Sequence, residues 1–190
     1  MGKKLDRRKK YTRMVLKNSL MELLNEKPIS SITIKELCSQ ADINRSTFYS
    51  HFTDQYDLLN HIEEEIIEEL DQSLLQYNYQ NKKEMFAMAK YLLDYVVNRS
   101  EHFRILFSEH GNKGFQHRVM EAAQSHIMSS LTHDHIISNK TRSKYISLYV
   151  ISGSINVIER WLEDGMKEST EEMTKIITEV SNNGMLHANL

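Results

Sequence analysis

The chain has 190 residues, 40% of them hydrophobic, and a formal net charge of −2 at pH 7. A single cysteine excludes an intramolecular disulfide and a multi-cysteine metal site, and no apolar run approaches the ~18 to 20 residues of a membrane helix, so we expect a soluble, cytoplasmic protein. One proline and six glycines are few breakers for this length, which predicts a mostly helical chain with one subdivided core.

The start of the chain is strongly basic. Only Asp6 opposes the cations there, which are Lys3, Lys4, Arg7, Arg8, Lys9, Lys10, Arg13 and Lys17. Two interpretations are open: a footprint for a polyanion such as nucleic acid, or a solvated, frayed terminus. Apolar residues at three- and four-residue steps predict a first helix over residues 6–24, which Pro28 ends.

Two short helices are expected next. Thr33, with Glu36 three residues later, is typical of a capped helix start, and the turn SQAD at residues 39–42 interrupts that helix. Asn44 then provides an N-cap for a second helix over residues 45–50. Two short helices joined by a tight turn form a helix-turn-helix.

Longer helices are expected in the rest of the chain. Thr53 or Asp54 begins a fourth helix, whose non-apolar face is strongly acidic. Gly165 is expected to close one of the later helices, and Ser169 with Glu172 begins the next by the same capping pattern. Beyond residue 80 the apolar spacing predicts helices over residues 84–98, 102–110, 115–132, 141–164 and 169–181.

The segment TIKELCSQADINRSTFYSHF, residues 33–52, follows the basic first helix and precedes the acidic fourth helix. In this setting it resembles the TetR family of bacterial transcriptional regulators, over residues 6–70. The resemblance implies an all-α fold: an N-terminal three-helix helix-turn-helix domain over residues 1–54, a fourth helix that bridges residues 53–75, and a C-terminal helical bundle for dimerisation and ligand binding over residues 76–190.

The resemblance also implies a function. The protein would be a homodimeric repressor that binds a palindromic DNA operator and responds to a small-molecule effector; the alternative is a co-regulator or activator of the same fold that acts through a protein partner. Arg45 is the candidate for a guanine contact, with phosphate as the alternative, and His51 either contacts phosphate or packs beside the core. The expected DNA-binding residues are Thr33, Asn44, Arg45, Ser46, Thr47, Tyr49, Ser50, His51 and Gln55.

Two positions depart from the family's pattern. Asp42 stands in the turn where relatives often have glycine, and aspartate adopts a left-handed backbone less freely than glycine does. Gln55 stands where relatives often have a phosphate-binding lysine. We therefore expect less phosphate affinity at Gln55 and a larger contribution from the basic start of the chain.

The second half of the chain offers a ligand pocket and a dimer interface, each with a simpler alternative. Residues 148–162 include Ser152, Gly153 and Ser154 and form, with the last helix, either a two-fold interface or an internal core helix. The stretch SGSINVIERWLEDGMKES resembles a subset of Gram-positive TetR-like proteins that includes relatives of the dihydroxyacetone kinase activator. The candidate ligand residues, which are otherwise core, are Tyr91, Tyr95, Phe103, Phe107, Met120 and Tyr149.

The sequence contains few of the motifs that mark a catalytic site or a metal site. His133 and His135 flank Asp134, yet no HExxH, no Glu-x-x-His step and no partner cysteine accompanies the histidines, so scattered surface histidines are favoured. No Gly-rich phosphate loop and no Gly-x-Ser-x-Gly elbow occurs. We expect no enzyme activity, no cofactor and no metal.

Overall fold

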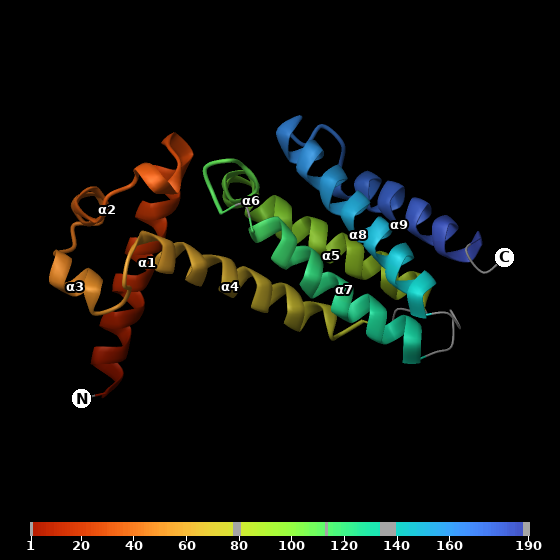
Figure 1. Ribbon diagram of the computed structural model, residues 1–190, viewed down its shortest axis with the longest axis horizontal. Coiled ribbons are helices and arrows are strands. Elements are labelled where there is room, and N and C mark those ends of the chain that lie inside the picture. The colour runs from red at the N-terminus through yellow and green to blue at the C-terminus, as the bar shows by residue number, and fades with distance from the viewer. Residues whose placement is uncertain (1, 78–80, 113, 134–139, 188–190) are drawn as a thin grey trace. The chain divides into compact units, whose positions relative to one another are not determined.

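A computed structural model of the chain describes residues 2–77, 81–112, 114–133 and 140–187 (Figure 1). Within these ranges the backbone forms nine α-helices, one short 3-10 helix (η1) and no strand, which confirms the all-α prediction. None of these helices combines the length and the apolarity that a membrane span requires. In chain order the elements are α1 Gly2–Glu26, η1 Ile29–Ser31, α2 Ile34–Gln40, α3 Arg45–Tyr49, α4 Gln55–Leu74, α5 Lys82–Asn98, α6 Ser100–Phe107, α7 Phe115–His133, α8 Lys140–Glu163 and α9 Thr170–His187.

Contacts divide the chain into two compact units. α4 contributes its first part to one unit and its last part to the other, and α6 is divided in the same way. The expected functional domains stay a prediction, because compactness alone assigns no role. The first unit comprises Met1–Ile66 and Ile105–Phe115, and the second unit comprises Ile67–Arg104 and Gln116–Leu190.

The first unit is built around one apolar core that α1, α2, α3 and the start of α4 surround (Figure 1). A segment distant in sequence joins it: the backbone N–H of Ile29 donates to the carbonyl of His110 at 3.0 Å. The ring Nδ1 of His110 also lies 2.8 Å from the carbonyl oxygen of Leu24. No sequence pattern predicted this contact. The fully buried side chains of the unit include Leu16, Leu20, Leu24, Leu37, Phe48 and Leu58.

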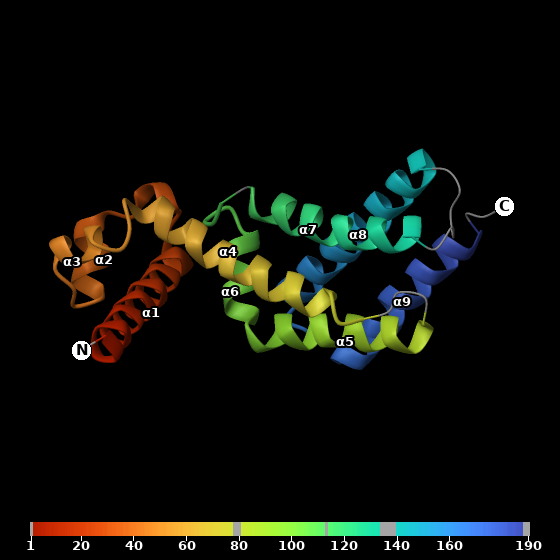
Figure 2. The same ribbon diagram turned by 90° about the horizontal axis from the view of Figure 1, so that it is seen from below.

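The second unit includes α9, which packs on α5 and α8 (Figure 2). Leu93 of α5, Trp161 of α8 and Met173 of α9 form a buried cluster there. Because burying one such side chain contributes ~1.5 to 3 kcal/mol, this cluster holds the three helices together. α9 continues to His187, beyond the expected end at residue 181.

The end of α8 and the start of α9 confirm two predictions from local pattern. Gly165 adopts a left-handed backbone with φ +86°, and the N–H of Met166 donates to the carbonyl of Trp161 at 2.9 Å, the six-residue bond of a Schellman motif. Ser169 then caps α9, since its hydroxyl accepts the N–H of Glu172 at 3.2 Å.

α6 differs from its expected extent. It spans Ser100–Phe107 rather than residues 102–110, and the hydroxyl of Ser108 donates to the carbonyl of Ile105 at 2.7 Å where the helix ends. Gly111 then passes close to the last turn, because a Cβ there would lie 3.0 Å from two carbonyl oxygens of α6. Glycine at this position lets the chain leave α6 early.

Candidate nucleic-acid interface

α3 is a five-residue helix with an aromatic inner face. Asn44 begins it in an extended conformation, and its Oδ1 accepts the backbone N–H of Thr47 at 2.8 Å, as the sequence predicted. Phe48 is completely buried and Phe52 nearly so, and their ring centroids lie 6.0 Å apart. These two rings anchor the segment in the core of the first unit.

Polar side chains occupy the outer face of α3. A helix of five residues has few backbone hydrogen bonds of its own, so its position depends on the aromatic anchor and on the N-cap. The exposed side chains are Asn44, Arg45, Ser46, Tyr49 and Ser50, and Thr47 is half-buried.

Tyr49, Ser50 and His51 differ in what they can offer a phosphate. The ring of Tyr49 is 57% exposed and meets Phe48 edge-on at 5.5 Å, which holds its position. The hydroxyl of Ser50 already donates to the carbonyl of Thr47 at 2.7 Å, so its proton is in use. The imidazole of His51 is half-buried beside the core.

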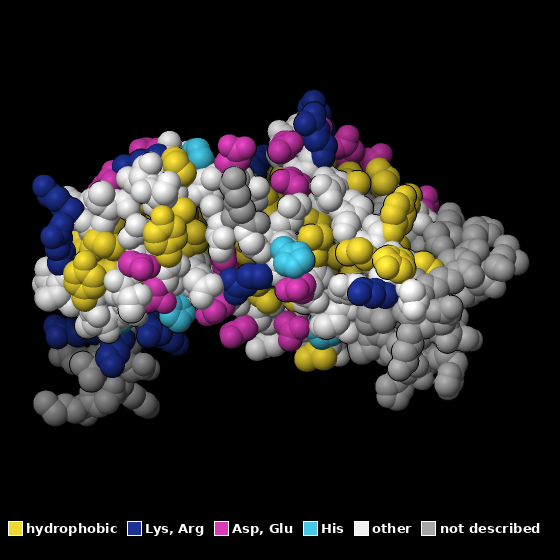
Figure 3. Space-filling model, viewed as in Figure 1, with side chains coloured by type: hydrophobic (Ala, Val, Ile, Leu, Met, Phe, Trp, Pro, Cys, Tyr) yellow, Lys and Arg dark blue, Asp and Glu magenta, His cyan; other side chains and the backbone are white. Residues whose placement is uncertain are grey.

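Positive charges of α1 affect the protonation of His51, which lies just after α3. Burial lowers the pKa of His51, and the positive charges of Arg13 and Lys9 lower it further. Figure 3 shows Lys and Arg side chains gathered over the part of the first unit that carries α3 and the beginning of α1. The side chains of Lys3 and Lys4 lie outside the described part. The exposed cations of α1 are Arg7, Arg8, Lys9, Lys10 and Arg13.

α2 begins at an exposed capping residue, as expected. Oγ1 of Thr33 accepts the N–H of Glu36 at 3.2 Å. Lys27 donates to the carboxylate of Glu36 at 2.5 Å, which lowers the pKa of that carboxyl, and the backbone N–H of Thr33 lowers it too. Thr33 therefore caps α2 as predicted, while the carboxylate of Glu36 is held by Lys27.

Sequence reasoning missed one cation on α2. Lys35 is exposed and lines an open hollow with Thr33, Glu36, Ser39 and Gln40. Its position two residues after the cap was the available signal, because the first turn of a helix presents its side chains beside the backbone N–H groups that attract anions.

The turn between α2 and α3 has the strained residue that the sequence suggested. Asp42 adopts a left-handed backbone with φ 51°, and the N–H of Ile43 donates to the carbonyl of Cys38 at 3.0 Å. Burial raises the pKa of the Cys38 thiol, although the charge of Arg45 opposes this. Cys38 therefore packs as a small apolar side chain under the turn.

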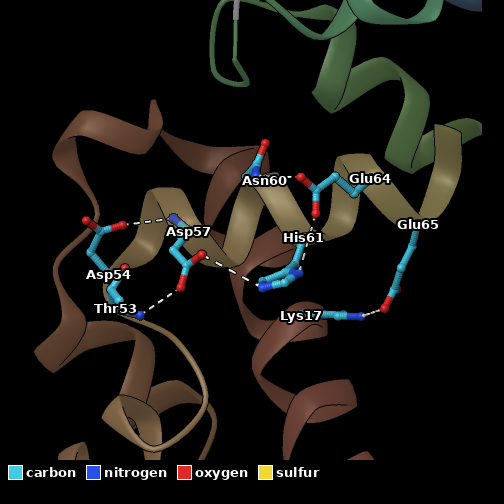
Figure 4. Close-up of polar contacts among 8 residues, drawn as sticks. All are labelled: Lys17, Thr53, Asp54, Asp57, Asn60, His61, Glu64 and Glu65. Carbon is cyan, nitrogen blue, oxygen red and sulfur yellow. Dashed lines mark hydrogen bonds and ion pairs between the residues drawn. The ribbon is translucent and has the colours of Figure 1, made fainter. Parts of the chain in front are cut away.

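α4 begins with acidic side chains (Figure 4). Asp54 Oδ1 accepts the N–H of Asp57 at 2.8 Å, and Asp57 accepts the N–H of Thr53 at 2.8 Å. Asp54 is thus the cap, of the two residues that the sequence left open. Gln55 is half-buried beside these carboxylates, which oppose the approach of a phosphate.

Further along α4, Figure 4 shows a second group of charges. Nε2 of His61 lies 3.8 Å from Oδ1 of Asp57, and its Nδ1 lies 3.7 Å from Oε2 of Glu64. Lys17 of α1 forms an ion pair with Glu65. Lys17, unlike the exposed cations of α1, therefore helps to hold α1 against α4.

The structure does not bring all six candidate ligand residues together. Tyr95 and Phe103 are buried and meet edge-on, with centroids 6.0 Å apart. Tyr149 is 76% exposed on α8. Phe107 belongs to the first unit, where its ring lies 5.7 Å from that of Phe115.

The remaining two candidates have polar contacts in the second unit. The hydroxyl of Tyr91 lies 3.2 Å from Oγ of Ser73, and the hydroxyl of Ser152 donates to the sulfur of Met120 at 3.5 Å. A ligand role for these six residues stays a prediction.

Histidines in the described part of the chain do not form a metal cluster: no group of three or more His, Cys, Asp or Glu side chains there is placed to hold an ion. His110 and His126 each have a hydrogen-bond partner. The side chain of His133, together with Asp134 and His135, lies outside the described residues.

Comparisons with known proteins agree on one family across both halves of the chain. The family model described as bacterial regulatory proteins, tetR family, matches residues 18–62, and the model described as transcriptional regulator C-terminal region matches residues 83–183. A curated relative, the uncharacterized HTH-type transcriptional regulator YxbF of Bacillus subtilis (strain 168), is 22% identical over 169 residues. That alignment covers 87% of this chain and 43% of YxbF, so the chain spans less than half of that relative's length.

Solved structures share the fold. A TetR transcriptional regulator from Streptococcus agalactiae 2603V is 20% identical, with a TM-score of 0.71, and the match covers 95% of this chain and 99% of that one. The dihydroxyacetone kinase operon activator DhaS is 17% identical, with a TM-score of 0.65 and coverage of 93% and 97%.

Proposed function

The chain belongs to the TetR family of DNA-binding transcriptional regulators, and we propose that it is a homodimeric repressor whose operator affinity changes when an effector binds its C-terminal half. The main support for a DNA interface is the division of α3 into a buried face and an exposed face. Buried Phe48 and Phe52 hold one face inward, while the opposite face exposes Asn44, Arg45 and Ser46. A helix presented in this way can enter the major groove and place side chains at base edges.

Contacts to bases and to the DNA backbone divide along the segment. Arg13 and Lys9 of α1, with Lys35 of α2, add attraction to phosphates that is independent of sequence. Ser50 and Gln55 contribute least, because the hydroxyl proton of Ser50 is in use and carboxylates flank Gln55. Base edges meet Asn44, Arg45, Ser46 and Thr47, and the backbone meets Thr33, Tyr49, Ser50, His51 and Gln55.

A salt titration tests the DNA interface, with the purified full chain and duplex DNA from the promoter region beside its own gene. Arg45→Ala should cost ~1 to 3 kcal/mol and Tyr49→Phe about 1 kcal/mol of binding free energy. If Arg45 contacts guanine, its loss also relaxes base preference. If it contacts phosphate, its loss weakens all sequences alike and lowers the salt slope by about 1.

A charge-matched control is Lys167→Ala, which removes an exposed cation between α8 and α9. Affinity and salt slope should stay as in the unmodified protein. Binding that is equally strong to every duplex, or absent at every salt concentration, would contradict operator recognition.

Dimerisation is supported by apolar side chains exposed on α8 and α9. Such a patch is costly on an isolated chain and is typical of an interface. Reading two half-sites one DNA turn apart, about 34 to 36 Å, requires two copies of α3, which a two-fold dimer would supply. The exposed side chains are Tyr145, Leu148, Tyr149, Val157, Ile176 and Val180.

Effector control would act through α4, which contributes residues to both units. In the second unit its Glu69 is held by Tyr95 of α5 and by Arg99, which directly follows α5. Its Asp71 is held by His126 of α7. An effector must bind one arrangement of these contacts better than the other, or it shifts nothing. A ligand that binds tightly but leaves operator affinity unchanged would contradict this control.

A second candidate is an activator or co-regulator that acts through a protein partner. The likeness to the operon activator DhaS supports activation and says nothing of a partner. Sequence-selective binding that depends on Arg45 distinguishes the two, because a protein-partner mechanism without DNA contact predicts no such dependence. In either case we propose a cytoplasmic protein without enzymatic activity or a cofactor.

A further inference from the structure

The side-chain oxygen of Asn44 holds three donors at once. Oδ1 accepts the backbone N–H of Thr47 at 2.8 Å, the hydroxyl of Thr47 at 2.9 Å and the hydroxyl of Ser46 at 2.7 Å. All three distances are within the normal range for hydrogen bonds. Asn44, which caps α3, therefore also fixes the orientation of two hydroxyl groups, and both belong to the segment proposed to contact bases.

The orientation of the Asn44 amide is determined by its backbone partner. A peptide N–H can only donate, so the atom 2.8 Å from the N–H of Thr47 must be the amide oxygen and not the nitrogen. The amide nitrogen then points away from the cap. Asn44 consequently offers DNA two N–H donors, whereas its acceptor is occupied; the bidentate pairing of asparagine with adenine, which needs both, is disfavoured.

The orientation of the Asn44 amide also fixes the direction of the hydroxyl protons of Ser46 and Thr47. An amide oxygen only accepts, so both hydroxyl protons point to Oδ1 of Asn44. Each hydroxyl has a single proton, and what remains toward the outside is lone-pair density. Ser46 is exposed and Thr47 is half-buried, so these lone pairs are within reach of a bound molecule.

We propose that Ser46 and Thr47 read the major groove as hydrogen-bond acceptors and so select the exocyclic amino group of cytosine or adenine, while Asn44 acts as the positioning residue. This rests on the proposed function, because it concerns which base edges the same interface prefers. Serine and threonine can ordinarily donate or accept and therefore discriminate weakly between bases. Here guanine and thymine, whose major-groove oxygens are acceptors, would have to draw a hydroxyl proton away from Asn44.

The size of the base preference follows from the cost of breaking a hydroxyl's hydrogen bond to Asn44 in order to form one to a base. Breaking one neutral hydrogen bond to satisfy another changes binding by roughly 2- to 13-fold. Each hydroxyl should therefore favour cytosine or adenine over guanine or thymine by about this factor. Arg45, which has only N–H donors, would select guanine at a neighbouring position.

The experiment selects bound duplexes from a random double-stranded DNA library with the purified full chain. The unmodified protein is compared with Ser46→Ala, Thr47→Val and the control Ser30→Ala, an exposed serine of η1. We expect cytosine or adenine at the positions that Ser46→Ala and Thr47→Val change, a loss of preference there of roughly 2- to 13-fold, and no change in Ser30→Ala.

Asn44→Gly separates positioning from simple contact. Glycine is an acceptable N-cap, so α3 should still form, but the two hydroxyls lose their common acceptor. We expect guanine and thymine to become acceptable at the positions read by Ser46 and Thr47, although neither residue has changed. If this variant does not fold, as judged by circular dichroism, Ser46→Ala and Thr47→Val alone decide whether the two hydroxyls act as acceptors.

Four results overturn one proposal or the other. Guanine or thymine at the positions that depend on Ser46 and Thr47 contradicts the acceptor assignment, and so does a selected motif that neither variant alters; both leave the proposed function intact. A folded Asn44→Gly variant that keeps the original preference contradicts the positioning role. Failure of the unmodified protein to enrich any sequence overturns the proposed function itself.

Discussion

The hydroxyl of Tyr95 donates a 2.7 Å hydrogen bond to Oε2 of Glu69, and so joins α5 to α4 in the second unit. Arg99 contacts the same oxygen at 3.0 Å, and its guanidinium carbon lies 4.0 Å from the centre of the Tyr95 ring. Burial raises the pKa of Tyr95 far above its usual value, and the bond to Glu69 raises it further. The hydroxyl therefore stays protonated and remains a donor at physiological pH.

Tyr95→Phe removes this hydrogen bond and leaves the ring in place. We expect a loss of about 1 kcal/mol in the free energy of unfolding, because Glu69 keeps its ion pair with Arg99. Urea unfolding followed by circular dichroism measures it. Tyr56→Phe is the control, since Tyr56 is exposed in the first unit and should change stability by less than ~0.5 kcal/mol. Equal effects of the two variants would contradict a structural role for the Tyr95 hydroxyl.

DNA binding should be coupled to protonation of His51. In the free protein burial lowers the pKa of His51, and Arg13 and Lys9 lower it further. A phosphate beside the ring would favour the imidazolium and raise that pKa, so the complex takes up a proton and affinity rises as the pH falls from about 7 to about 5.5.

The measurement for His51 is operator affinity against pH at constant salt. His51→Gln cannot take up the proton, and its affinity should vary less with pH than that of the unmodified protein. Identical pH profiles for the two proteins would mean that His51 packs beside the core without contacting phosphate, which is the other interpretation of this residue.

Asp42 holds a left-handed backbone in the turn before α3, with φ 51°. Asp42→Ala should lower the free energy of unfolding by ~1 to 2 kcal/mol, because Cβ of alanine is disfavoured there and no polar side chain compensates. Asp42→Gly should be close to neutral, since glycine tolerates this backbone but gains entropy in the unfolded chain. A larger loss for glycine than for alanine would show that the Asp42 side chain, not its backbone angle, is what matters.

The apolar side chains exposed on α8 and α9 should mediate dimerisation. Tyr149 is 76% and Val180 64% exposed, so aspartate at either position should be tolerated within one protomer but oppose burial against a second. Sedimentation equilibrium should show a shift from dimer to monomer for Tyr149→Asp and Val180→Asp, with unchanged helicity. A dimer as strong as that of the unmodified protein in both variants would place the interface elsewhere.

Gly153 allows a closer test of the same surface. A Cβ at Gly153 would meet nothing within 4 Å in its own protomer, and alanine favours a helix over glycine by ~1 kcal/mol. Gly153→Ala should therefore stabilise α8 but weaken the dimer, if a partner helix approaches closely at the small residues. Stabilisation without any change in dimerisation would contradict that close approach.

Helix ends were largely predictable from the sequence, because a cap is a hydrogen bond between residues two or three apart. Thr33, Asn44, Ser169 and Gly165 act at the ends where the pattern placed them. The early end of α6 was not predictable in this way. It coincides with the close approach of Gly111 to α6, in a segment where His110 also contacts the carbonyl of Leu24 near the end of α1.

The sequence by itself determined the all-helical fold, the caps and the division of α3 into buried aromatic and exposed polar residues, because all of these depend on neighbours within one or two helical turns. Only the tertiary structure decided that Arg13 and Lys9 act on His51, that Glu69 is shared by Tyr95 and Arg99, and that Ile105–Phe115 joins the first unit. These contacts join residues far apart in the chain. Spacing along a sequence carries no information about which distant side chain will lie opposite, since packing of the whole core decides it.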